Sequence, residues 1–280
     1  MNRRDFLKLS TRALAGVALA GGAAGLAESG FPRVRQQEIF LTGLAREFDG
    51  WTVALLSDFH HSAWITTDHI RRAVDLTNAR RPDLVLLTGD YIHRGREWVA
   101  PCFAELARLR ARAGVFGVLG NHDHYDGAAR ACRDAMRRAG IVDLTNAGVD
   151  LRRSGSVLRL AGVGDLWREK QNLRVALGWH GKPESALVLS HNPDFTESVR
   201  DPRVGLILSG HTHGGQVVLP VLGPPIVPSR HGRKYLSGLC QGPSARVFVT
   251  TGVGCSFPPV RWNCPSEIAW LTLRRAQILS

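Results

Sequence analysis

The stretch Leu206-Ile-Leu-Ser-Gly-His-Thr-His-Gly-Gly215 joins a short apolar run to two closely spaced histidines. Short runs of leucine and β-branched residues bounded by Gly and Ser are typical of buried strands. Four other runs in the chain have the same form, and they lead to Asp58-Phe-His60, Asp90, Asn121-His122-Asp123 and His191. Each of the five runs therefore ends on residue types that bind metal ions.

The repetition of this layout predicts one shared site. In open α/β sheets, ligands bind in the crevice where the carboxyl ends of the strands meet. A single Asp or His after a strand is more often a turn or capping residue. Five strand ends with the same layout favour a common metal site instead, and we interpret their mixture of carboxylate, amide and imidazole groups as a site for two ions.

Lengths and patterns along the chain predict the order of the elements. Strands are expected at 34–41 (an edge strand), 51–57, 84–88 and 115–119, and helices at 66–80, 97–113 and 126–139. This alternation implies a parallel sheet with right-handed crossovers. The second half is expected to hold a hairpin at 150–163, helical turns at 172–179 and 194–199, strands at 186–190, 204–209, 246–250 and 268–273, and a long surface loop at 219–242.

The motifs at these strand ends resemble those of the calcineurin-like metallophosphoesterases. They are Asp58-Phe-His60, Gly89-Asp90, Gly120-Asn-His-Asp123, His191 and Gly210-His-Thr-His213, in the order of that family. The resemblance covers most of the chain after the first thirty residues. Gly-His-Thr-His-Gly-Gly-Gln at 210–216 and Pro265-Ser-Glu-Ile268 are similar to the exported bacterial YkuE-like phosphodiesterases. The resemblance implies an α/β fold of the four-layer αββα sandwich type.

The resemblance also implies a ligand set for two divalent ions, with Mn, Fe or Zn as the expected metals. The first ion would be held by Asp58, His60 and His213, the second by Asn121, His191 and His211, and Asp90 would bridge them. In an extended segment, residues two apart point to the same side, which suits Asp58 with His60. Glycines before Asp90, Asn121 and His211 would allow the tight backbone that turns each ligand inward.

His122 is the predicted catalytic residue. In the family's Gly-Asn-His-Asp motif, this His stabilises the phosphoryl oxygens or protonates the leaving oxygen, and the alternative is a solvent-exposed loop residue. Phosphoprotein phosphatases carry Gly-Asp-x-x-Asp-Arg-Gly, whose second Asp orients the catalytic His. His93 stands at that position here, so the orienting partner is left open and protein phosphatase activity is disfavoured. His61, His93 and His124 are expected at the rim of the site or simply exposed.

The first thirty residues are predicted to be a signal segment, with one metallophosphoesterase domain at 31–280. Arg3-Arg-Asp-Phe-Leu-Lys8 resembles a twin-arginine export signal, and the apolar run at 13–27 is shorter than the roughly 20 residues of a membrane span. An ordinary amphipathic helix is the alternative. We therefore expect the twin-arginine machinery as a partner and the periplasm or cell-envelope surface as the location, with an uncleaved signal serving as an anchor if it is retained.

Charge and cysteine content narrow the partners. The net charge of +12 favours anionic partners such as envelope polymers or lipid headgroups. Nucleic acid is a minor option, because no long basic run carries interleaved aromatic residues. None of the five cysteines forms a Cys-x-x-Cys pair, which argues against a thiolate zinc site; Cys255 and Cys264 are either a disulfide or buried thiols.

Together these features predict an exported enzyme that hydrolyses phosphodiester, pyrophosphate or phosphomonoester bonds through a metal-bridging hydroxide. Its substrate would be associated with the envelope, either lipid-linked or attached to a wall polymer. Two alternatives stay open: a non-catalytic basic envelope-binding protein that retains the metal site, and a secreted nuclease.

Overall fold

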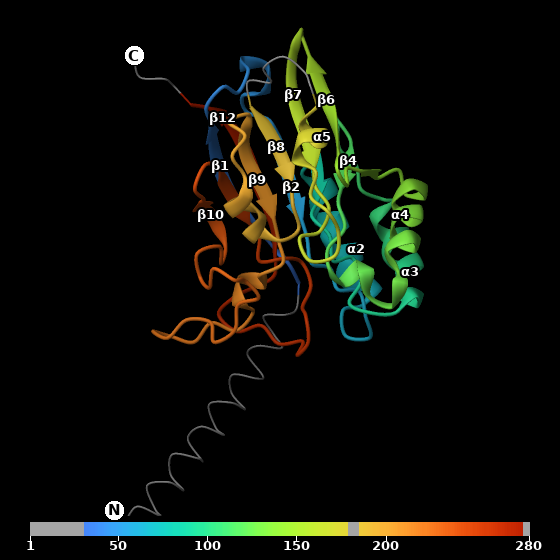
Figure 1. Ribbon diagram of the computed structural model, residues 1–280. Helices are drawn as coiled ribbons and strands as arrows, with labels where there is room; N and C mark the ends of the chain where they lie inside the picture. Colours follow the sequence, from blue (N-terminus) through green and yellow to red (C-terminus); the bar gives the residue numbers. More distant parts are fainter. Residues whose placement is uncertain (1–30, 179–184, 277–280) are drawn as a thin grey trace, which may run out of the picture.

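The computed structural model describes residues 31–178 and 185–276 (Figure 1). The predicted signal segment, residues 1–30, lies outside the described residues. Two sheets of six strands each lie face to face. In order, the first sheet contains β1 (Arg33–Leu41), β12 (Glu267–Arg275), β2 (Thr52–Leu56), β3 (Leu84–Leu87), β4 (Val115–Gly117) and β5 (Val142–Asp143). The second contains β10 (Gly238–Gln241), β11 (Arg246–Val249), β9 (Val204–Ser209), β8 (Ala186–Leu189), β7 (Ser156–Gly162) and β6 (Ala147–Arg153).

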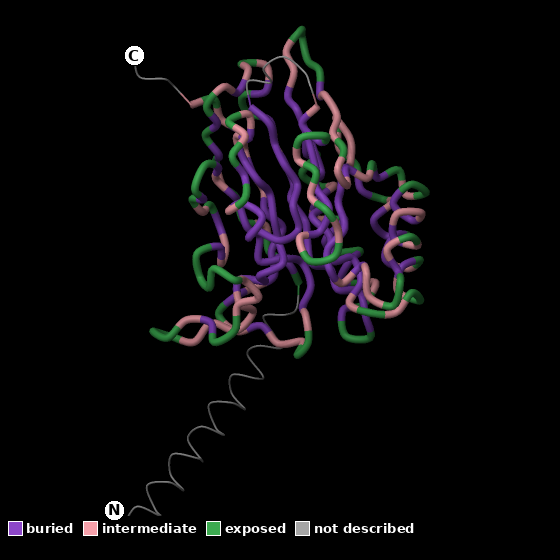
Figure 2. Tube along the Cα trace, in the orientation of Figure 1, coloured by how far each residue is buried: buried purple, intermediate pink, exposed green. Residues whose placement is uncertain are grey.

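Alternation along the strands builds the layers. In β2, Val53 and Leu55 belong to the apolar core between the sheets, whereas Ala54 and Leu56 belong to the core under the helices. Because successive side chains of a strand point to opposite faces, a strand without polar residues must be covered on both sides. Figure 2 shows the resulting buried strands in the middle of the molecule.

Helices cover the outer face of each sheet. The first sheet is covered by α2 (Thr67–Ala79), α3 (Val99–Leu106) and α4 (Ala129–Arg138). The second is covered by α5 (Leu173–Leu177) and the 3₁₀ helix η4 (Pro193–Ser198), which contribute Leu177 and Phe195 to its outer core. The short 3₁₀ helices η1 (Arg46–Phe48), η2 (Arg96–Trp98), η3 (His122–Gly127) and η5 (His213–Gly215) complete the fold. The expected four-layer α/β sandwich is confirmed.

Strand direction places the site. In the first sheet β2, β3, β4 and β5 are parallel, and in the second β7, β8, β9 and β11 are parallel. Their carboxyl ends open at the lower edge in Figure 1. By contrast, β12 is antiparallel to β2 and parallel to β1, so β1 begins at the edge where β2 ends.

Two local expectations were wrong, and one strand was missed. The helix expected at 97–113 divides into η2 and α3 and ends at Leu106, because the next residues bond across to the start of β3: the Arg112 and Ala113 amides donate to Pro82 and Asp83 (3.2 and 2.8 Å). The sequence also did not reveal β5, and β10 lies inside the expected loop at 219–242. Tertiary pairing decided all three. None of the helices among the described residues has both the length and the apolar character needed to cross a bilayer.

Candidate metal centre

Asp58, His60 and His213 form a buried group at the carboxyl ends of strands from both sheets. Asp58 and His60 follow β2, and His213 opens η5 after β9. The Nε2 atoms of His60 and His213 lie 3.0 Å apart, and His213 Nε2 lies 3.3 Å from Asp58 Oδ1. The three ligand atoms therefore converge on one point, and we call these residues the first triad.

Asp90, His191 and His211 form a second triad beside the first. His191 Nε2 lies 3.1 Å from His211 Nδ1 and 3.2 Å from Asp90 Oδ2. Asn121 Oδ1 lies 3.1 Å from the same His191 nitrogen. The structure thus brings together all the residues that the sequence nominated for the second ion.

Asp90 lies between the triads. Its Oδ2 atom is 3.5 Å from His60 Nε2 in the first triad and 3.2 Å from His191 Nε2 in the second. One carboxylate oxygen is thus near both groups, which is the placement that a bridging ligand needs.

The arrangement of lone pairs fits cations. His191 Nδ1 donates to the Thr88 carbonyl (2.8 Å), so in the neutral ring the Nε2 lone pair faces the triad. The Nε2 atoms of His60 and His213, 3.0 Å apart, are close enough together to bind one cation. A hydrogen bond explains such a contact only if one ring carries a proton toward the other, whereas a cation accepts both lone pairs.

The charge balance points the same way. Burial and the neighbouring His122 hold the pKa of His60 well below its ordinary value, and burial with Arg261 does the same for His213. Burial also opposes charge on His191, yet the Asp90 and Asp58 carboxylates outweigh it and raise the pKa of His191 to about 10. The His60 and His213 rings therefore stay neutral near pH 7, with lone pairs available to a cation, and the carboxylates around His191 attract positive charge that divalent cations would supply in place of a proton.

The sequence analysis expected extended backbone at the ligands, but the structure does not have it. Five of the seven candidate ligands have positive φ angles: Asp58 (54°), His60 (48°), Asp90 (54°), His211 (72°) and His213 (53°). Such angles are uncommon outside Gly and cost energy, so surrounding contacts must impose them. Of the glycines before the ligands, Gly89 has the positive φ (97°) of the tight backbone predicted from the sequence. Gly120 and Gly210 contribute space, because a Cβ on Gly120 would overlap the Asp90 carboxylate and one on Gly210 would overlap that of Asp58.

Asp123 holds the Asp90 loop, a role that the sequence did not reveal. Its buried carboxylate accepts hydrogen bonds from the amides of Asp90 (2.9 Å), Tyr91 (2.8 Å) and Gly120 (2.9 Å). These bonds tie the loop after β3 to the loop after β4. The only signal was its position as the last residue of the Gly-Asn-His-Asp motif.

Arg261 is a second residue that sequence reasoning missed. It is fully buried, and its guanidinium donates to the carbonyls of Thr251 (2.6 Å), Gly254 (2.7 Å) and His213 (3.3 Å). It also approaches His213 Nδ1 at 3.4 Å. Arg261 thus supports the first triad from behind.

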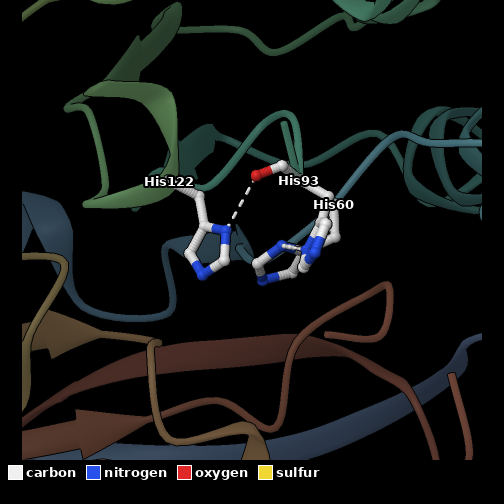
Figure 3. Close-up of side chains that lie close together, drawn as sticks. All are labelled: His60, His93 and His122. Carbon is white, nitrogen blue, oxygen red and sulfur yellow. Dashed lines mark hydrogen bonds between the residues drawn. The ribbon is translucent and has the colours of Figure 1, made fainter. Parts of the chain in front are cut away.

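His122 is anchored by a backbone carbonyl. Its Nδ1 donates to the His93 carbonyl (2.8 Å), which leaves Nε2 as the unprotonated ring nitrogen in the neutral form (Figure 3). Its ring meets that of His60 edge-on at 4.6 Å. Asn121 and His122 lie in a helical turn and not in the extended segment expected from the sequence. Their side chains still diverge, Asn121 toward His191 and His122 toward His93.

His93 is the outer neighbour of His60. Their Nδ1 atoms lie 3.3 Å apart, and burial together with His122 lowers the pKa of His93 to about 4, so its ring is neutral near pH 7. If His60 binds a cation through Nε2, its Nδ1–H would donate to His93. Of the other rim candidates, His61 is buried and contacts the Trp98 carbonyl (3.1 Å), whereas half-buried His124 faces Glu169 (3.7 Å). All five cysteines are thiols, so Cys255 and Cys264 form no disulfide.

Comparison with known proteins now identifies the family. The family model for calcineurin-like phosphoesterases matches residues 52–215, which include both triads. The chain is a calcineurin-like metallophosphoesterase. It is 32% identical to the uncharacterized metallophosphoesterase YkuE of Bacillus subtilis (98% of each chain) and 32% identical to the phosphodiesterase YaeI of Escherichia coli (98% of this chain, 99% of the relative). A metallophosphoesterase of Helicobacter pylori shares 31% identity over 96% of this chain and 71% of its own. This metallophosphoesterase belongs to the YkuE-like branch, and the family depends on metal ions.

Proposed function

We propose that this metallophosphoesterase hydrolyses a phosphodiester bond with two divalent cations, using Asp90 as the shared ligand. The observation that carries the proposal is the position of Asp90 Oδ2 between two buried groups of ring nitrogens and carboxylate oxygens. Preference for a diester is supported by the name of the relative YaeI, a phosphodiesterase. Pyrophosphate and phosphomonoester bonds are the secondary candidates.

The chain's own residues divide the work. Asp58, His60 and His213 would hold the first cation, and His191, His211 and Asn121 the second. Cations in such a site neutralise the phosphate charge and activate water as the nucleophile. The His93 carbonyl holds the Nδ1 proton of His122. Nε2 would take up a second proton from solvent and donate it to the leaving oxygen.

A nuclease and a non-catalytic binding protein are the alternatives. The complete ligand set favours catalysis over binding alone. Purified metal-loaded protein should hydrolyse bis-p-nitrophenyl phosphate faster than p-nitrophenyl phosphate and leave single- and double-stranded DNA intact. Rapid cleavage of DNA would support the nuclease, whereas no turnover of either ester at full metal loading would support the binding protein.

Export by the twin-arginine route is part of the proposal. Arg3-Arg-Asp-Phe-Leu-Lys8 motivates it, and this route would let the protein acquire its metals before export. Replacing both Arg3 and Arg4 by Lys should retain the protein in the cytoplasm of its host, as measured by cell fractionation. Unchanged export of the double variant would refute the route.

A further inference from the structure

The loop that follows η5 exposes apolar side chains next to the first triad. Val221, Leu222 and Ile226 in this loop and Phe257 in the loop before β12 have relative exposures between 67 and 104%. We call these four residues the apolar rim. Water-exposed side chains of this size are unusual when they gather on neighbouring loops, and such patches mark interaction surfaces.

The two loops of the apolar rim are joined to each other. The Gln216 side chain accepts from the Ser256 amide (2.9 Å) and donates to the Pro258 carbonyl (2.7 Å), on either side of Phe257. The Val218 amide donates to the Trp262 carbonyl (2.9 Å). These contacts fix the second loop against the first.

Both loops of the apolar rim lie close to the metal centre. Pro224 packs directly on Gly215, two residues after His213, leaving no room there for a Cβ. On the other side, the Trp64 ring lies 5.9 Å from that of Phe257 and 5.0 Å from that of His93. A partner that covers the apolar rim would therefore lie over the entrance to the candidate site.

The tip of the first loop is held outward at a conformational cost. Val221 has a φ of 66°, an outlier for a β-branched residue, and lies at the centre of a tight turn in which the Leu222 amide donates to Pro220 (2.7 Å). Leu219 and Gly223 exchange two backbone hydrogen bonds beneath it (3.1 and 2.8 Å). Strain of this kind persists where the position of a residue matters.

Basic residues follow the apolar tip in the same loop. Arg230 and Arg233 are exposed, and neither forms an ion pair with a carboxylate among the described residues. The Arg233 guanidinium donates to the carbonyls of Leu222 (2.5 Å) and Pro224 (3.2 Å), so this cation is fixed close to the tip. Apolar side chains next to arginines suit the boundary between acyl chains and anionic headgroups.

The entry point of the chain lies at the same end of the molecule. Arg33 pairs with Glu267, whose amide donates to Gly252 (2.9 Å), and Gly252 packs on Asp58. The thirty residues before Phe31, with their apolar run at 13–27, therefore join the described chain beside the metal centre. If that segment is retained as an anchor, it would hold this end toward the bilayer.

We infer that the apolar rim docks on an anionic lipid bilayer and turns the metal centre toward phosphoesters linked to lipid. The bilayer is favoured over a protein partner by the arginines next to the tip, the net charge of +12 and the attachment of the predicted signal segment at this end. The lipid-linked substrate class is a narrower form of the proposed function and rests on it. The docking on the bilayer is independent of the proposed function.

Site-directed fluorescence on the full chain tests the docking. Leu222→Cys carries an environment-sensitive fluorophore on the apolar rim, and Phe40→Cys carries it at the carboxyl end of β1, the opposite end of the molecule. On vesicles of phosphatidylcholine with phosphatidylglycerol, the probe at 222 should shift to the blue and the probe at 40 should not. Labelled wild-type protein corrects for reaction of the native thiols.

If the probes at 222 and 40 show the same spectral shift in vesicle-bound protein, the docking is overturned. This outcome holds even where the signal segment is what binds the vesicle. In a second measurement, Leu222→Ser/Phe257→Ser should weaken binding to these vesicles by about tenfold. If the signal segment alone keeps the protein bound, the readout is the blue shift of a probe at Ile226→Cys, which should become smaller in this double variant. The matched control Phe40→Ser/Val175→Ser removes a similar exposed pair elsewhere and should behave as wild type. Equal behaviour of both double variants would contradict the inference.

The substrate class is tested on the p-nitrophenyl ester of phosphatidic acid in the same vesicles. Water adds at phosphorus and p-nitrophenol leaves, giving phosphatidic acid. The ratio of this turnover to that of soluble bis-p-nitrophenyl phosphate should fall about tenfold in Leu222→Ser/Phe257→Ser, and an unchanged ratio would reject the lipid-linked class. If wild-type protein does not turn over the soluble ester, the proposed function is rejected instead. The fluorescence measurement would still decide whether the apolar rim docks on the bilayer.

Discussion

The two triads contain the same residue types, yet their outer contacts differ. In the second triad, His191 Nδ1 donates to the backbone carbonyl of Thr88, at 2.8 Å. In the first, His60 Nδ1 meets the half-buried side chain of His93, at 3.3 Å. The sheet thus fixes one imidazole through its backbone, whereas the other depends on a neighbouring side chain. A ligand held by a backbone carbonyl, as in the second triad, is insensitive to single substitutions around it. A ligand held by a side chain, as in the first triad, can be tuned by them.

Asp90→Asn should have the largest effect, because it alters the one ligand that both triads share. An amide supplies no negative charge to either cation, so both should bind weakly and turnover of bis-p-nitrophenyl phosphate should fall to the background rate. Elemental analysis and steady-state kinetics measure these quantities. Full activity in this variant, or full activity of wild type with well under two ions per chain, would refute the shared site.

His122→Ala should come next, with a loss in turnover but not in metal. His122 belongs to neither triad, although its ring nitrogens and those of His60 and His93 also lie close enough together to hold a cation. A general acid contributes about 10²–10⁴-fold in rate. The loss should be severe for an alkyl ester and mild for a nitrophenyl ester, whose leaving group needs no proton. Loss of metal would make His122 a ligand, and equal losses for both esters would indicate stabilisation of transition-state charge.

Arg261→Met should destabilise the side of the molecule behind the first triad. Four backbone carbonyls, those of His213, Thr251, Gly254 and Cys264, would lose a charged donor in a fully buried position, which should lower the free energy of unfolding by about 3 kcal/mol. Denaturant titration measures the change. Arg274→Met, which removes an exposed pair with Glu38, is the control and should change stability by less than about 1 kcal/mol. Similar losses in both variants would contradict this role.

His93→Ala should have the smallest effect and should discriminate between the triads. Removing an outer partner of a ligating His costs about 10–100-fold in metal affinity, and here only the ion of the first triad should be affected. Competition with a chelator would show one weakened ion and one unchanged ion. His93→Asp, which restores an acceptor, should recover the affinity, and His124→Ala should leave both ions unchanged. Equal weakening of both ions by His93→Ala would remove the distinction between the triads.

The orientation of His122 shows why some of the site could not be predicted. The sequence indicated that the Asp found in phosphoprotein phosphatases is replaced by His93, which left His122 without an evident partner. The structure supplies that partner from the His93 backbone, and a main-chain carbonyl is present whatever the side chain. A substitution pattern cannot reveal such a contact, because it depends on where two loops meet.

The sequence by itself determined the layered α/β fold, the order of its main strands and the set of residues that meet at the carboxyl ends of strands from both sheets. Strand-length apolar runs carry that information locally, and each ended on a polar residue at the same edge. The tertiary structure alone decided the early end of α3, the strands β5 and β10, the positive φ angles of five ligands and the roles of Asp123, Arg261 and His93. These features depend on hydrogen bonds and close contacts between segments far apart in the chain, which no local pattern specifies.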